Sequence, residues 1–119
     1  METVSYAYRF SYPSDSNGNP FPILQLRVSN PSDREKGVDI EGYLDSGAEY
    51  SLLNGWIARS IGIDLLGGSI RNYSPARGDP IVGRVHRVSL SHPTLGNFEI
   101  EIGFSTEPIR RELLGRDFF

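Results

Sequence analysis

Hydrophobic and polar residues alternate with a period of two in several parts of the chain, the pattern typical of half-buried β-strands. Four stretches show it: residues 4–12, 23–29, 38–44 and 98–104. The first has a strongly aromatic face. Residues 81–90 carry branched side chains on both faces and predict one more strand. The polar residues 30–37 predict a solvated hairpin loop.

The spacing of apolar residues lengthens after residue 50, which predicts a short helix or helical turn. Its hydrophobic side would consist of Leu52, Leu53, Trp56, Ile57 and Ile61. Asn54 is a candidate N-cap, and Gly62 is a candidate end of the helix. Because Trp56 shares this apolar side, we expect it in the core.

Residues 65–84 are rich in Gly, Pro, Ser and Arg. Taken as a loop, they would form a long irregular segment, and such segments are usually functional. The whole pattern amounts to six or seven strands and one short helix, without repeats or a second domain. We therefore predict an all-β fold in which residues 1–119 form a single domain, most simply a small closed or nearly closed barrel.

Composition narrows the possible partners. The net charge of −3, from 12 basic and 15 acidic residues, argues against nucleic acid or an anionic membrane as the main partner. The chain has no cysteine, and its two histidines lack metal-site spacing, so we expect no metal and no cofactor. We see no signal-peptide pattern and no run long enough to span a membrane, so we expect a cytoplasmic protein.

Residues 43–48 have the make-up of an active-site turn. Two large apolar residues end a strand, and Asp45 follows at the edge of the packed sheet. Ser46 adds a hydroxyl, Gly47 lets a second backbone approach closely, and Ala48 keeps the next position small. The pKa of a carboxylate in such a tight, partly buried turn can be tuned. Alone, the tripeptide also fits an ordinary Asp-Ser-Gly turn.

A second stretch, residues 113–117, reads Leu-Leu-Gly-Arg-Asp. Together the two stretches resemble the retropepsin-like aspartic proteases, over about residues 21–119. In that family a hydrophobic pair followed by Asp-Thr/Ser-Gly-Ala carries the catalytic acid. A later hydrophobic-hydrophobic-Gly-Arg-Asp/Asn segment packs behind it and opens a helix. Both motifs occur here in the family's order within one small domain.

The resemblance implies an aspartic endopeptidase with Asp45 as its catalytic residue. Peptide hydrolysis by carboxylates needs two of them sharing one proton, and this chain has a single Asp-Ser-Gly. A homodimer is therefore implied, with one Asp45 from each subunit. The family pattern also implies that Ser46 hydrogen-bonds to the other subunit, that the Gly47 carbonyl meets the substrate and that Ala48 lines the floor.

For the second motif the resemblance implies a structural role for Gly115, Arg116 and Asp117. Arg116 would lie behind the active-site loop, where it could pair with Glu49; two separate surface charges are the alternative. The flap of the family, a hairpin that closes over a bound peptide, would lie within residues 65–84.

A polypeptide substrate would bind as an extended strand between the active-site loops and the flaps. The sequence stops at residue 119, before the C-terminal helix and strand that usually complete the family's dimer. The aromatic residues 4–12 are the candidate substitute at the interface.

Two other readings remain open. The first is a peptide-binding module that keeps the retropepsin-like fold and dimer but cuts little or nothing. The second is a plain β-barrel interaction domain, for example of an oligonucleotide-binding type. The negative net charge and the lack of a basic stripe with interleaved aromatic residues count against the second.

Overall fold

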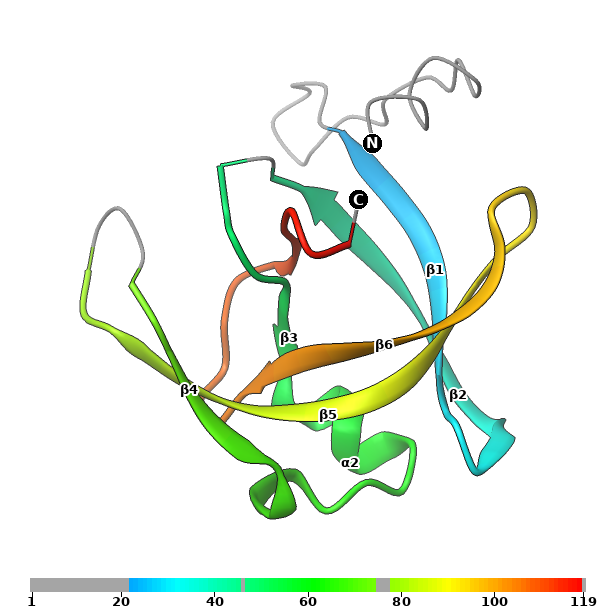
Figure 1. Cartoon of the computed structure of the whole chain (residues 1–119), viewed down its shortest axis with the longest axis horizontal. Coiled ribbons are helices and arrows are strands. Elements are labelled where there is room, and N and C mark those ends of the chain that lie inside the picture. Colours follow the sequence, from blue (N-terminus) through cyan, green and yellow to red (C-terminus); the bar gives the residue numbers. More distant parts are fainter. Residues whose placement is uncertain (1–21, 46, 75–77, 119) are drawn as a thin grey trace.

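The computed structural model describes residues 22–45, 47–74 and 78–118. These residues form one sheet with a short α-helix and a 3-10 helix beside it (Figure 1). The strands are β1 (Ile23–Asn30), β2 (Asp33–Leu44), β3 (Leu52–Asn54), β4 (Ser69–Tyr73), β5 (Ile81–His92), β6 (Gly96–Ser105) and β7 (Glu112–Leu114). The helices are α2 (Gly55–Ser60) and η1 (Leu65–Gly67). The all-β prediction is confirmed, while the strand predicted at residues 4–12 lies outside the described residues.

The sheet closes on itself. Its strand order is β1-β2-β7-β3-β6-β5-β4. An additional pairing of β1 with β5 closes every strand except β4 into a ring. Among the described residues, strand β4 pairs only with β5, and it extends from the ring as one arm of a hairpin (Figure 1). Most pairs are antiparallel, but β2 with β7 and β3 with β6 are parallel. A ring of this kind leaves few open strand edges.

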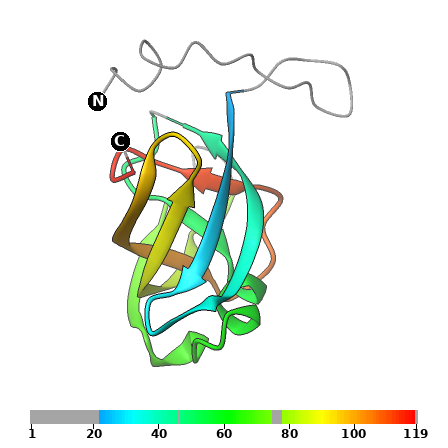
Figure 2. The ribbon, with the colours of Figure 1, turned by 90° about the vertical axis from the view of Figure 1, so that its right-hand side faces the viewer.

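The interior of the ring is apolar. Strand β1 contributes Leu24, Leu26 and Val28, and the inward positions of β5 and β6 add Val88, Leu90, Ile102 and Phe104. Helix α2 covers one end of the ring, and the C-terminal turn lies at the other end (Figure 2). Strands β1, β5 and β6 thus turn apolar side chains into the core.

The connection predicted as a loop at residues 30–37 is shorter than expected. Strand β2 already begins at Asp33, and Asn30 pairs directly with Asp33 across the turn. The polar residues that suggested a loop form the exposed start of a long strand. Asp33 and Gly37 pair with Asn30 and Ser29 of β1, and the Asp33 carboxylate accepts the Glu35 amide, so a polar sequence can still be strand there.

The helix prediction was wrong at its start. Leu52 and Leu53 belong to strand β3, because β3 pairs with β6 on one side and β7 on the other. Trp56 is 51% exposed and not in the core, since Ile57 and Ala58 are the α2 side chains that turn inward. Asn54 occupies the N-cap position but makes no side-chain cap bond.

Residues 65–84 hold more regular structure than a loop. Helix η1 comes first, and β4 and β5 then form an antiparallel hairpin with Tyr73 opposite Ile81. The η1 turn is fastened to β5, because the Arg84 guanidinium donates to the Leu66 and Gly68 carbonyls. The hairpin expected from the family resemblance is therefore present, and whether it acts as a flap is considered below.

Candidate active site

Asp45 stands directly after strand β2, on a loop that strand β7 supports. Tyr43 and Leu44 pair in parallel register with Leu113 and Leu114 of β7. The Asp45 amide then donates to the Leu114 carbonyl at 2.9 Å, which continues the ladder by one step. The two sequence motifs therefore meet as neighbouring strands, and Asp45 lies exposed at their common end.

The loop that follows holds the Asp45 carboxylate through its own backbone. Oδ1 of Asp45 accepts the Gly47 amide at 2.9 Å, and the Asp45 carbonyl accepts the Ala48 amide at 3.1 Å. This local bonding is an Asx-turn, which aspartate favours when it leaves a strand. Gly47 and Ala48 thus position the carboxylate, while Ser46 lies outside the described residues.

Behind the loop, Ser51 and Asp117 form a buried polar network. Oδ1 of Asp117 accepts both the Ser51 amide at 2.8 Å and the Ser51 hydroxyl at 2.6 Å. The Ser51 Oγ in turn accepts the Gly115 amide at 2.9 Å. Ser51 is fully buried, and bonds to a carboxylate are stronger than neutral ones. Sequence reasoning missed Ser51; a lone hydroxyl at the start of a buried apolar run was the available signal.

The second motif also contacts the loop backbone to backbone. The Arg116 and Asp117 amides donate to the Ala48 and Glu49 carbonyls at 2.8 and 3.3 Å. Gly115 is required here, since a Cβ would lie 2.7 Å from the Tyr50 carbonyl oxygen. The Glu49–Arg116 ion pair expected from the family pattern is not formed between these two described residues, because their segments already meet through the main chain.

Comparison with solved structures identifies the fold. A retropepsin-like aspartic protease from Rickettsia conorii matches with a TM-score of 0.60 and 19% identity, covering 91% of this chain and 75% of that one. The EIAV protease, complexed with the inhibitor HBY-793, matches with a TM-score of 0.57 and 16% identity, covering 87% and 88%. The chain has the retropepsin-like fold. No protein-family model matches the sequence, and neither does any curated protein.

In this retropepsin-like fold the β4–β5 hairpin contacts the loop that carries Asp45. The Arg71 guanidinium of β4 lies 4.0 Å from the centroid of the Tyr50 ring, a cation–π contact. Tyr50 is five residues after Asp45, so this contact joins the hairpin to the Asp45 loop. Neither residue stood out in the sequence, because a cation–π pair between distant segments has no local pattern.

Tyr73, at the end of β4, reaches back over the sheet. Its ring occupies the space left by Gly83 and Gly103, where a Cβ would collide with it. Its hydroxyl is buried and has no well-formed hydrogen bond. Burial raises the pKa of the Tyr73 hydroxyl above its ordinary value of 10.0, although Arg71 opposes the shift. Asp117, whose Oδ2 is also buried without a partner, adds to the rise.

The segment before β7 is anchored through Asn54. Oε1 of Glu112 accepts the Asn54 amide and its side-chain NH₂, both at 2.8 Å. Oδ1 of Asn54 accepts the Ile109 amide at 2.8 Å. Asn54 was predicted to cap a helix, and instead its side chain organises the neighbouring loop.

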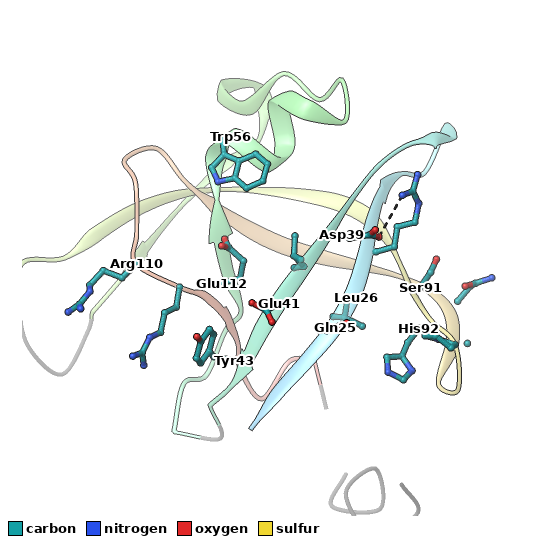
Figure 3. Close-up of a pocket in the computed structure, with 16 residues that line it drawn as sticks. Gln25, Leu26, Asp39, Glu41, Tyr43, Trp56, Ser91, His92, Arg110 and Glu112 are labelled. Atoms are coloured by element: carbon teal, nitrogen blue, oxygen red, sulfur yellow. Dashed lines mark ion pairs between the residues drawn. The ribbon is translucent and has the colours of Figure 1, made fainter. Parts of the chain in front are cut away.

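Two hollows adjoin this segment. One, of about 1090 Å³, crosses the outer face of β1 and β2; Figure 3 shows Tyr43 and Arg110 at the end away from His92. The other, of about 460 Å³, lies beside the hairpin.

No described residues form a group of three metal ligands. In the same part of the chain, no helix is long and apolar enough to cross a bilayer.

Proposed function

We propose that the protein is an aspartic endopeptidase that acts as a homodimer, each subunit supplying one Asp45 carboxylate. The proposal rests on the way in which the Asp45 carboxylate is held by its loop. The carboxylate is exposed at the end of β2, fixed by the Gly47 amide, and backed by the buried Ser51–Asp117 network. Proteins of the same retropepsin-like fold, named above, are aspartic proteases.

The proposed chemistry follows from bringing two carboxylates together. Two like charges at hydrogen-bonding distance cannot both ionise, so the pair holds one proton and titrates as a unit. One Asp45 takes a proton from the attacking water, while the protonated Asp45 hydrogen-bonds to the scissile carbonyl. An exposed carboxylate at the tip of a rigid loop suits this role, since it can face its symmetry mate.

The polypeptide substrate would lie between the Asp45 loop and the β4–β5 hairpin. We propose that this hairpin is the flap, because Arg71 already links it to the loop through Tyr50. An extended peptide would gain affinity from main-chain hydrogen bonds, including one to the Gly47 carbonyl. Ala48 would line the floor, and Ser46 would bond across the two subunits.

The direct test is cleavage of a mixed peptide library by the wild-type protein and by Asp45→Asn. Asn is nearly isosteric but cannot act as the base, so we expect product peptides from the wild type only. A statine-type transition-state mimic should abolish the wild-type cleavage. Asp64→Asn is the matched control, because Asp64 is the N-cap residue of η1 and belongs to neither sequence motif.

The result separates the two candidate roles. Cleavage that survives in purified Asp45→Asn would remove Asp45 as the catalyst. If the wild type binds the statine mimic but produces no cleavage, the protein is the peptide-binding module that the sequence left open.

A further inference from the structure

The side chain of Tyr73 fills a slot between the β4–β5 hairpin and strand β6. A Cβ added to Gly83 would lie 2.7 Å from Cε1 of Tyr73, and a Cβ added to Gly103 would lie 2.7 Å from its Cζ. Since both contacts are too close for a real side chain, only glycine at these two positions leaves room for the ring. The slot is therefore shaped for one aromatic ring.

This slot lies on the face of the sheet that points away from the core. Leu53 and Phe104 belong to the core, so their neighbours Leu52 and Gly103 turn to the opposite face. Leu52 is nevertheless only 2% exposed. Its Cδ1 lies 3.2 Å from the position that a Cβ on Gly83 would take, so the hairpin covers it. The hairpin and the sheet thus enclose an apolar space outside the core.

The smaller hollow adjoins the slot. Leu52 lines the hollow and also borders the slot, and Ile81, the cross-strand partner of Tyr73, lines the hollow as well. Five of the seven residues that line the hollow are apolar, and the other two are arginines. If the Tyr73 side chain turned outward, the hollow would extend across Gly83 and Gly103. The protein therefore fills part of an apolar site with one of its own side chains.

Tyr73 is a poor occupant of this slot because of its hydroxyl. The oxygen is buried and has no well-formed hydrogen bond. Burial of the ring is favourable, but removal of the hydroxyl from water without a replacement bond costs free energy. A phenyl group offers the same ring without that cost, so a phenylalanine side chain should fit the slot better than Tyr73 does.

The slot is within reach of a peptide held at Asp45. Leu52 pairs with Gly103 on one side and with Leu113 on the other. Leu113 in turn pairs with Tyr43, two residues before Asp45. The path from Gly103 to Tyr43 crosses three strand pairings, at most about 14 Å. An extended peptide covers this distance in about four residues.

We propose that Tyr73 sets the specificity of the site by filling, in the free protein, the slot that takes a phenylalanine side chain of the substrate. The proposal rests on the function proposed above, because it names the substrate class of the same site. Tyr73 ends β4, which pairs only with β5 among the described residues, so the phenyl group can displace it. The better the resident side chain fits, the weaker the peptide binds.

The test uses two libraries of ten-residue peptides that differ at one central position, which is Phe in one and Tyr in the other. Their affinity for Asp45→Asn, measured by fluorescence anisotropy, reports binding without cleavage. We expect the Phe library to bind about tenfold more tightly, because the tyrosine hydroxyl finds no partner in the slot. For the wild type, kcat/KM should show the same preference.

Two variants of Tyr73, made in the Asp45→Asn protein, should change the affinity for the Phe library in opposite directions. Tyr73→Ala empties the slot and should raise the affinity about three- to tenfold. Tyr73→Phe is the better occupant and should lower it about three- to fivefold. The loss of a merely structural contact would not produce opposite shifts, and Tyr73→Phe keeps the test valid if Tyr73→Ala does not fold.

Ile70→Ala is the matched control. Ile70 lies in the same strand as Tyr73, but it is 62% exposed and, an odd number of residues away, points to the other face of β4. The affinity of this variant for the Phe library should stay within about twofold of that of the parent.

The outcomes separate this inference from the proposed function. Equal affinity of the two libraries, or shifts in the same direction for both Tyr73 variants, overturns the inference, while cleavage by the wild type would still support the protease. Phe-selective binding with opposite shifts supports the inference even when the wild type cleaves neither library, a result that would remove the protease. Binding of neither library overturns the inference as well.

Discussion

The residues around Asp45 differ sharply in how they are held. The carboxylate itself is exposed and fixed through the amide of Gly47, whereas Ser51 is fully buried and bonded to Asp117 and Gly115. The charge-bearing group is thus free to meet a partner, and the rigidity comes from the layer behind it. This division suits a site that must keep its geometry while part of it stays accessible.

Ser51→Ala tests that supporting layer. Removal of the hydroxyl leaves the Gly115 amide without its acceptor and removes one donor to Asp117, so unfolding should become easier by about 1–3 kcal/mol. Urea unfolding measures the change. Ser32→Ala, at the exposed β1–β2 turn, is the control and should stay within about 0.5 kcal/mol. A Ser51→Ala protein as stable as the wild type would show that the network contributes little.

Tyr73→Phe tests the buried hydroxyl. Because that hydroxyl has no well-formed bond, its removal should leave stability unchanged or raise it by about 1 kcal/mol at neutral pH. The pKa of Tyr73 is raised by burial, so its contribution is present below about pH 10 and is lost as the pH rises further. The wild type should therefore lose more stability above about pH 10 than Tyr73→Phe does. If the wild type and Tyr73→Phe lose the same stability above about pH 10, burial does not raise the pKa of Tyr73.

Among the elements, the β4–β5 hairpin has the proposed role of a flap. That role rests on one side-chain contact with the Asp45 loop. Strand β4 pairs only with β5, so it has none of the two-sided support that β3 receives. The stacking of Arg71 on Tyr50 connects β4 to the Asp45 loop. An element held on one side opens at a lower free-energy cost than the ring.

Arg71→Met should loosen that connection, because methionine keeps much of the length but removes the charge over the ring. Exposed cation–π contacts contribute about 0.5–1 kcal/mol, so the amides of β4 should exchange about two- to fivefold faster. Hydrogen exchange read by mass spectrometry gives the measurement. Arg87→Met, whose guanidinium pairs with Glu99 on exposed surface, should leave β4 unchanged. If the β4 amides exchange at the same rate in Arg71→Met as in the wild type, the Arg71–Tyr50 contact does not hold β4 to the Asp45 loop.

For the whole molecule, one chain supplies only half of the proposed site. The described residues of one chain form a ring of strands around a buried core, and we expect this core to form without a second chain. The proposed activity nevertheless requires a second Asp45. Folding and activity should therefore depend differently on protein concentration.

Mixing tests this dependence. When wild type is exchanged with a ninefold excess of Asp45→Asn, most wild-type chains pair with an inactive partner, so activity per wild-type chain should fall about tenfold. The same excess of wild type carrying Asp64→Asn should cause no such loss, and sedimentation velocity at the assay concentrations reports the dimer. Activity that is unaffected by the Asp45→Asn excess would mean that one chain carries a complete site.

The sequence by itself determined the strand pattern and the two motifs. Alternation identified β1, the later part of β2 and β6, because burial of one face imposes a period of two whatever the neighbours are. The order of Asp45-Ser46-Gly47-Ala48 and Gly115-Arg116-Asp117 indicated the retropepsin-like fold, since these short segments carry the family's pattern locally.

Tertiary structure alone decided what pairs with what. Leu52 and Leu53 form a strand because β6 and β7 lie on both sides of them. Trp56 is exposed because the side of α2 that carries Ile57 and Ala58 faces the core. The Asp117–Ser51 network and the Arg71–Tyr50 contact each depend on the fold, because it brings together segments that are far apart in the chain. Such contacts join residues far apart in the chain and produce no periodic pattern in the sequence. They can therefore be identified only from the three-dimensional structure.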